Sequence, residues 1–404
     1  MLHWQKVDAS AGTIWGAEDD GDDVDMDLSH LEQLFKLEDA KAMKKKDVAI
    51  EGQKTSTIHL IDMKRSHNIS IQLSGLKLPF PEVRDALMGM EECLTVEQLQ
   101  VLLGAVPTEQ EKRKLKAFDG DRALLGQVEL YFMEIMDIPR LTQRIDSLIF
   151  KANYDAGMKR VRDDVGHLLQ ACTELKKSQS FAKVLKAVLR VGNHLNQGSF
   201  KGGAQGFKLE TLLNLNTVKG VDRSTSLLAY VIMELAKTAP QTLFLSAELS
   251  YVGRASVLQP EVVESLLNEL KGGLKRVQNE VLHAAGVLEG GESLGHETFR
   301  NVMVPFCETA EDEVDRLDRQ TKAAFAALRD LSAYFGETYS KESPCAVFLT
   351  VKAFLADFDK THDAIKRKQE AEEKERRREA EKAARKKRSQ SVVNLKGLVP
   401  PGGA

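Results

Sequence analysis

The sequence predicts an all-α protein with long helices, and three observations support this fold class. Its 404 residues include only 10 prolines and 6% aromatic residues, while Leu, Ala, Lys and Glu are abundant, a composition that favours helices. Apolar residues recur three and four residues apart over residues 140–196. Residues 309–335 form a heptad pattern. Together these features argue against an all-β sandwich, a collagen and a globally disordered chain.

Residues 58–145 are predicted to form a compact helical unit. Helical stretches are expected around residues 82–104 and 108–136. The second stretch begins at a capping box, because Thr108 precedes Glu111 by three residues. We therefore expect Thr108 to be the N-cap of a helix.

Residues 140–196 are predicted to be strongly helical, with apolar stripes at steps of three and four residues. The first stripe consists of Val161, Val165, Leu168, Cys172 and Leu175. A second stripe consists of Phe181, Val184 and Val188, with Gly192 and Leu195 continuing it. Because Cys172 belongs to a stripe, we expect its thiol to be packed rather than reactive.

A glycine-rich loop interrupts the helices at residues 198–206, where four of nine residues are glycine. A phosphate-binding loop would follow a strand and carry the GxxxxGK[ST] pattern, and neither feature is present. Two interpretations stay open. The segment is either a flexible loop, or a loop whose backbone must approach another surface closely, with Phe207 as its anchor.

Helices are predicted to resume at residues 209–214, 223–238 and 260–283. The heptad that follows should form a seam against another helix, and Gly336 should end it. The seam residues are Val314, Leu317, Thr321, Ala324, Leu328, Leu331 and Phe335. A final helix is expected after Pro344, running into the C-terminal tail.

The two ends of the chain carry opposite charge. Residues 18–27 contain seven carboxylates, close to both tryptophans, Trp4 and Trp15, and we expect an extended arm whose aromatic side chains need another surface. Residues 366–388 contain 12 Lys and Arg against 6 Glu, a local balance of +6 in a chain of net charge −3. This tail should be a solvated single helix or disordered, and disordered from Ser389. Its charge favours an acidic partner such as a filament, a nucleic acid or a lipid surface.

No catalytic or metal-binding pattern stands out. The nine histidines are dispersed, the four cysteines form no CxxC pair, and no GxSxG, GxGxxG or HExxH motif occurs. His194 lies between Asn193 and Asn196, which we interpret as a polar cluster at a helix end. No apolar run of membrane-spanning length and no signal peptide is present. We therefore expect a protein that is not an enzyme, binds no cofactor or metal, and occupies a reducing compartment.

Six separated blocks of sequence, in the correct order over about residues 1–365, resemble the formin-homology-2 domain of the formin family. They are LHWQKV (2–7) with TIW (13–15); DMKRSHNISI (62–71); PRL (139–141) with IFK (149–151); ACTEL (171–175) with Ser178 and Phe181; GNHLNQGS (192–199) running into GFKL (206–209); and Lys219 with Asp222 and LL (227–228). Gly220 departs from the family, which more often has Ser there. The proline-rich segment that precedes such domains is absent, so we expect the chain to be a fragment of a longer protein.

The resemblance implies an elongated all-α module that forms a head-to-tail dimeric ring. It divides the chain into a lasso arm (1–35), a flexible linker (36–57), a knob (58–140), a coiled-coil region with a post (141–365) and a basic tail that is helical and then disordered (366–404). It also places residues 69–73 in a helix. The alternation of apolar and polar residues over 68–73 indicates a strand instead, and we follow the resemblance here.

The activity that the resemblance implies is nucleation of unbranched actin filaments and processive capping of the barbed end by the dimer. Ile71 and Lys219 match the actin-contacting positions. The positions expected to support dimerisation are Trp4, Trp15, Asn193, Asn196, Gly198, Gly206 and Phe207.

The implied partners are actin and a second copy of the chain, in the cytoplasm at the actin cytoskeleton. Profilin-bound actin would be reached through an upstream proline-rich segment, and microtubules through the basic tail; nucleic acid is not expected. The alternative is a helical dimeric scaffold that binds microtubules, membrane or other partners through its tail without nucleating actin.

Overall fold

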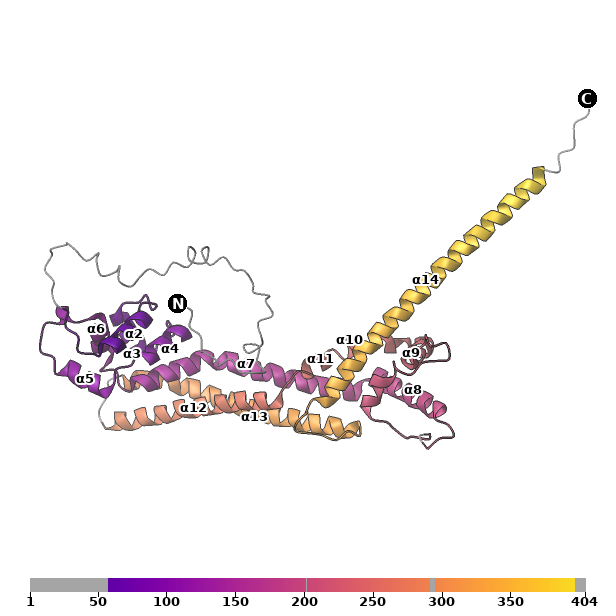
Figure 1. Ribbon diagram of the computed structural model, residues 1–404. Helices are drawn as coiled ribbons and strands as arrows, with labels where there is room; N and C mark the ends of the chain where they lie inside the picture. Colours follow the sequence, from indigo (N-terminus) through magenta and orange to yellow (C-terminus); the bar gives the residue numbers. More distant parts are fainter. Residues whose placement is uncertain (1–56, 201, 291–294, 397–404) are drawn as a thin grey trace, which may run out of the picture. The chain divides into compact units, whose positions relative to one another are not determined.

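The structure, a computed structural model, describes residues 57–200, 202–290 and 295–396 (Figure 1). The chain divides into two units, Met1–Ile58 and His59–Ala404, and the account that follows concerns the second. The predicted arm and nearly all of the predicted linker, with Trp4 and Trp15, lie outside the described residues. Within the described part of the chain every regular element is a helix, which confirms the all-α fold class.

Short helices form an N-terminal cluster. They are α2 (Met63–Leu73), α3 (Phe80–Gly89), α4 (Val96–Gly104), α5 (Glu109–Lys116) and α6 (Gln127–Ile135), with the 3₁₀ turn η2 (Arg122–Leu124). The predicted capping box is confirmed: the Glu111 amide donates to Thr108 Oγ1 at 3.3 Å, and the Thr108 amide donates to Glu111 Oε2 at 2.7 Å. The predicted stretch 82–104 is two helices, because α3 ends at Met90, whose backbone is left-handed with a φ of 53°.

The stretch with strand-like periodicity is the second half of α2, so the prediction from periodicity is wrong and the one from resemblance is confirmed. Ile69 and Leu73 are buried, and four residues separate them, so they share one face of a helix. Asp62 caps the helix by accepting hydrogen bonds from the amides of Lys64 and Arg65. Ile69 and Leu73 are apolar in a strand pattern, which repeats every two residues, and also in this helix, where they are four residues apart. Only Ile71, between them, fits the strand pattern and not the buried face of the helix.

Three long helices lie alongside one another: α7 (Leu141–Lys177), α12 (Pro260–Glu289) and α13 (His296–Tyr334) (Figure 1). Contacts of α7 with α12 and α13 show how these helices run relative to one another. The phenol of Tyr154 on α7 donates to the backbone carbonyl of Ala310 on α13 at 3.3 Å, and Arg140 pairs with Glu280 on α12. With the further contact of Gly157 against Leu270, α7 runs antiparallel to α12. Arg144 donates to the carbonyl of Gly295, directly before α13, so α7 runs parallel to α13. All five residues of the first predicted stripe, Cys172 included, are buried in this segment.

Helix α7 also joins the N-terminal cluster to a C-terminal cluster. At its start the fully buried guanidinium of Arg144 donates to the carbonyls of Pro139, Leu87, Met88 and Gly295. At its end Glu174 accepts hydrogen bonds from Ser250 Oγ at 3.2 Å and the Tyr251 amide at 3.0 Å. The 30 residues between these two anchors correspond to about 45 Å of helix. Helices α12 and α13 pack against α7 between the two anchors.

The C-terminal cluster surrounds the first half of α14 (Ala346–Lys396). Its other elements are α8 (Gln179–Leu195), η3 (Leu209–Asn214), α9 (Leu227–Thr238), η4 (Pro240–Phe244), α10 (Leu245–Glu248) and α11 (Val252–Ala255). Helix α14 buries Phe348, Phe354 and Phe358 and packs against the core as far as Ile365. Residues 366–383 are exposed, and the helix continues beyond Ser389, ending at Lys396.

The predicted heptad seam is buried through Leu331, and Phe335 is half-buried against Phe181. The helix ends as predicted at Gly336, whose φ is 68°. The Gly336 amide donates to the Ala333 carbonyl and the Glu337 amide to the Ser332 carbonyl, the two bonds of a Schellman motif. This end of α13 lies beside the start of α8, so α13 also reaches the C-terminal cluster.

Candidate functional site

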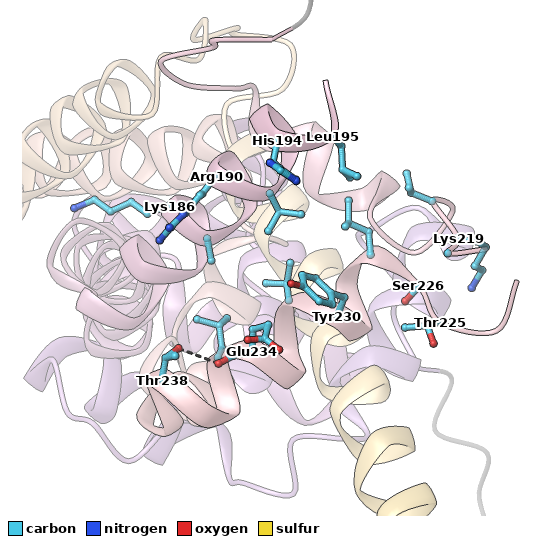
Figure 2. A pocket seen from close by; sticks show the side chains of 17 residues that line it. Lys186, Arg190, His194, Leu195, Lys219, Thr225, Ser226, Tyr230, Glu234 and Thr238 are labelled. Atoms are coloured by element: carbon cyan, nitrogen blue, oxygen red, sulfur yellow. Dashed lines mark hydrogen bonds between the residues drawn. The ribbon is translucent and has the colours of Figure 1, made fainter. Parts of the chain in front are cut away.

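A groove of about 1090 Å³ lies between α8, α9 and the turn that precedes α9 (Figure 2). Its apolar lining consists of Ala187, Val191, Leu195, Val218, Leu227, Tyr230, Val231 and Leu235. Leu195 was expected to continue the buried stripe of α8, and that prediction is wrong, because the side chain is exposed and lines this groove. The groove thus presents exposed apolar surface that a monomer does not cover.

Basic side chains line one wall of the groove. Lys186, Arg190 and His194 are exposed and follow one another at intervals of four residues, so they form a single stripe along α8 (Figure 2). Lys219 lies on the opposite side. The one carboxylate in the lining, Glu234, accepts a hydrogen bond from Lys237 at 2.7 Å. Within the described part of the chain, Lys186, Arg190 and Lys219 make no ion pair, so the rim carries uncompensated positive charge.

Lys219 is presented by a tight turn over residues 218–226. It forms an antiparallel bridge with Ser226, and the Leu227 amide donates to the Val218 carbonyl at 2.9 Å. Asp222 stabilises the turn by accepting hydrogen bonds from Ser224 Oγ at 2.5 Å and Thr225 Oγ1 at 2.7 Å. These bonds, together with those from the two backbone amides, hold the pKa of Asp222 well below its usual range.

Gly220, the departure from the family pattern, fits this turn. A Cβ there would lie 3.0 Å from the Asp222 carboxylate, so a larger residue would require a small shift of that side chain. The Gly220 amide donates to the Thr225 carbonyl at 2.9 Å, and the turn closes around it. The glycine therefore leaves the position of Lys219 intact.

The glycine-rich loop is clamped by Asn193, which does not line the groove. The Asn193 amide nitrogen donates to the Ala204 carbonyl, and the Ala204 amide donates back to Asn193 Oδ1, both at 2.8 Å. Asn196 is the C-cap of α8, and its carbonyl accepts from the Ser199 amide at 3.0 Å. Gly198 has a φ of 82°, a conformation that favours glycine.

The far end of the loop is fixed to the end of α13. Phe207 packs half-buried against the core, and Gly206 leaves open space around its Cα. Lys208 donates to the Gly336 carbonyl, and the Leu209 amide donates to Glu337 Oε1 at 2.8 Å. Five residues predicted to support dimerisation lie in the described ranges, and they shape the glycine-rich loop beside the groove. None of them lines the groove itself: Asn193, Asn196, Gly198, Gly206 and Phe207.

Ile71 belongs to the N-terminal cluster and lies on the exposed side of α2. Its side chain is 59% exposed, and Met63 and His67 share its face at intervals of four residues. Ile71 and Lys219 therefore stand on different clusters, and the structure does not bring them together. Both are nevertheless on the surface, as a contact with another protein requires.

Sequence reasoning missed the groove itself. A signal was present, because Ala187, Val191 and Leu195 repeat every four residues beside the buried stripe of α8. No set of three or more His, Cys, Asp or Glu residues with metal-binding geometry occurs in the described ranges. None of the described helices combines the length and apolar character needed to cross a bilayer.

Comparison with known proteins agrees with this arrangement. The model of the Formin Homology 2 domain matches residues 1–359. The chain is 31% identical over 403 residues to formin-like protein 8 of Oryza sativa subsp. japonica, covering 91% of this chain and 44% of the relative. It is 30% identical over 400 residues to formin-like protein 1 of Arabidopsis thaliana, covering 89% and 37%. The chain thus spans less than half the length of these curated relatives, and it belongs to the formin family as a Formin Homology 2 domain.

Proposed function

We propose that this chain, as a homodimer, nucleates unbranched actin filaments and remains on the growing barbed end while subunits add. Formin Homology 2 domains are non-enzymatic regulators of actin, so the activity is one of binding and positioning. The N-terminal cluster, with α2, acts as the knob, and the groove-bearing C-terminal cluster acts as the post. Association with the actin cytoskeleton follows from this activity.

The observation that carries the proposal is the exposure of Ile71 and Lys219, which stand on the two clusters that α7 joins. An isoleucine on a helix is usually buried, and Ile71 is 59% exposed. Lys219 is exposed beside the groove and makes no ion pair within the described ranges, so its charge is available to another protein. Two actin subunits held in a filament-like arrangement by such contacts lose less entropy when they join, which favours the nucleus.

Dimerisation provides a second copy of the actin-contacting surfaces. We infer that Trp15 of one copy enters the groove between α8 and α9 of the other, where Leu195 and Tyr230 are exposed. A buried tryptophan removes about 150–250 Å² from water, or about 4–6 kcal/mol before the arm's ordering is subtracted. The two-fold relation repeats the contact.

Processive capping follows from the bivalence of such a ring. While one half holds a terminal subunit, the other can release and step to a new one, because the linker tethers it at high local concentration. Profilin-bound actin, delivered through a proline-rich segment, would enter at this step.

An actin assembly assay tests the proposal. Fluorescent actin is polymerised with increasing doses of the full chain and of Trp15→Ala, and sedimentation equilibrium gives the mass of each. We expect a dose-dependent loss of the lag phase with the native chain. Trp15→Ala should be monomeric and should retain the lag. A native chain that leaves the lag unchanged at every dose would refute nucleation.

A second candidate function rests on the exposed part of α14. Residues 366–383 are exposed along a helix that leaves the core at Ile365, and the full 366–388 segment has a balance of +6. A scaffold that binds microtubules or another acidic surface through this tail, without nucleating actin, would use these residues. Cosedimentation with microtubules in parallel with the assembly assay separates the two functions.

A further inference from the structure

We propose that the basic wall of the groove binds the acidic run of residues 18–27 from a second copy of this chain, so that the dimer is closed by charge as well as by a tryptophan. This inference rests on the proposed dimerisation and deepens it. It identifies the occupant of the basic stripe and makes the strength of the dimer depend on salt.

The first argument is the unpaired charge on the wall. Lys186, Arg190 and His194 form one stripe along α8, and Lys219 faces them across the groove. Neither Lys186 nor Arg190 has a carboxylate partner among the described residues. Lys183, three residues before Lys186, extends this stripe by one turn beyond the lining of the groove. Positive charge is therefore concentrated where the apolar surface is also exposed.

The second argument is the composition of the arm. Residues 18–27 contain seven carboxylates and no cation, and the run begins three residues after Trp15. Three extended residues span about 10 Å, and the stripe from Lys186 to His194 covers about 12 Å of α8. If Trp15 occupies the apolar part of the groove, the first carboxylates of the run fall within reach of the stripe. An aromatic residue followed by acids complements an apolar groove with a basic rim.

The third argument concerns repulsion within the arm itself. Seven carboxylates in ten residues repel one another, and this repulsion opposes any ordered conformation of the isolated arm. Contact with Lys186 and Arg190 would relieve it. The contacts are exposed, so they should be screened by salt over a length of about 8 Å at physiological ionic strength. The tryptophan contact is apolar and should depend on salt far less.

The experiment measures the dimer dissociation constant by sedimentation equilibrium at about 50 mM and about 300 mM KCl. For the native chain we expect weaker dimers at the higher salt. The double variant Lys186→Glu, Arg190→Glu should weaken the dimer about tenfold at low salt, which several exposed pairs at two symmetric contacts can supply. Lys322→Glu, at an exposed lysine of α13 outside the groove, is the control and should leave the constant unchanged.

A charge swap provides the decisive test. Asp19→Lys, Asp20→Lys and Asp22→Lys alone should weaken the dimer, and combining them with Lys186→Glu and Arg190→Glu should restore it, because each contact then pairs opposite charges again. Failure of the swap to restore the dimer would overturn the inference. If Trp15→Ala dissociates the dimer while salt and both charge variants have no effect, the proposed function stands and the electrostatic contact is wrong. A native chain that is monomeric throughout would overturn both.

Discussion

Ile69 and Ile71 are two residues apart on α2 and lie in opposite environments. Ile69 is 2% exposed and packs in the N-terminal cluster, whereas Ile71 is 59% exposed on the other side of the helix. Two residues of α-helix correspond to a rotation of about 200°, which accounts for the difference. The pair separates a structural position from a candidate binding position with the same amino acid.

Replacing Ile71 by Ala should therefore abolish acceleration of actin assembly with little loss of stability. An exposed substitution changes the free energy of unfolding by about 0.5 kcal/mol or less. Ile69→Ala should instead cost about 2–5 kcal/mol, because it opens a cavity in the core. Denaturant unfolding and the fluorescent assembly assay measure the two effects separately.

Leu282→Ala is the matched control for Ile71, since this leucine is an exposed apolar residue on α12, away from both candidate surfaces. It should leave both stability and actin assembly unchanged. A large loss of stability in Ile71→Ala, or equal loss of activity in Leu282→Ala, would argue against an actin contact at α2.

Lys219→Asp should remove actin assembly activity more completely than Lys219→Ala, while the dimer persists. The reversed charge would repel an acidic actin surface, whereas alanine only removes the attraction. Lys322→Asp on α13 is the control, because this exposed lysine lies outside the groove. Equal activity of Lys219→Asp and Lys322→Asp would exclude Lys219 from the actin contact.

Asp222→Asn should reproduce part of the Lys219 defect, because it weakens the turn that presents the lysine. The carboxylate accepts from two hydroxyls and two amides, and the pKa of Asp222 is lowered chiefly by the Ser224 hydroxyl. A lowered pKa means that the stabilisation is present above the ordinary value of about 4 and is lost as pH falls below it. The defect should therefore be the same at about pH 6.5 and pH 8 in the assembly assay. A defect that changes between these pH values would show that another group titrates.

Only one of the four cysteines should react in the native protein. Burial raises the pKa of Cys172 to about 12 and that of Cys307 and Cys345 to about 11, so their thiolates are scarce and covered. Cys93 is exposed. Titration with Ellman's reagent at about pH 8 should find one thiol before unfolding and four in guanidinium. Two or more native thiols would contradict the packing of α7, α13 or α14.

The sequence was sufficient to predict the features that depend on local rules. The capping box at Thr108 and the helix stop at Gly336 depend on residues within one or two turns, and both are confirmed. The stripe containing Cys172 was predictable because α7 is long and keeps one face buried. The fold class and these two helix ends were therefore predictable from the sequence.

The candidate site was less predictable because it is assembled from distant segments. Lys219 lies across the groove from Arg190, 29 residues away in sequence, and only the turn closed by Asp222 brings them to one surface. Leu195 continues an apolar stripe in sequence yet faces the groove, because a binding surface and a core use the same residue types. Burial is predicted from the hydrophobic pattern, so an apolar side chain that is exposed at a binding surface is predicted wrongly.

Removal of the basic tail should leave the folded dimer and its barbed-end capping intact. The structure sets the place for the truncation, since Ile365 is still packed against the core and residues 366–383 are exposed. Removing residues 367–404 therefore takes away charge without opening the core.

The exposed cations should attract acidic filament surfaces only over a short, salt-dependent range, about 8 Å at physiological ionic strength. We expect the truncated chain to nucleate less efficiently at about 50 mM KCl and to match the full chain at about 200 mM, where screening is stronger. Assembly curves of both chains at both salts, with sedimentation to verify the dimer, measure this difference. Identical curves at low salt would show that the tail contributes nothing to actin assembly.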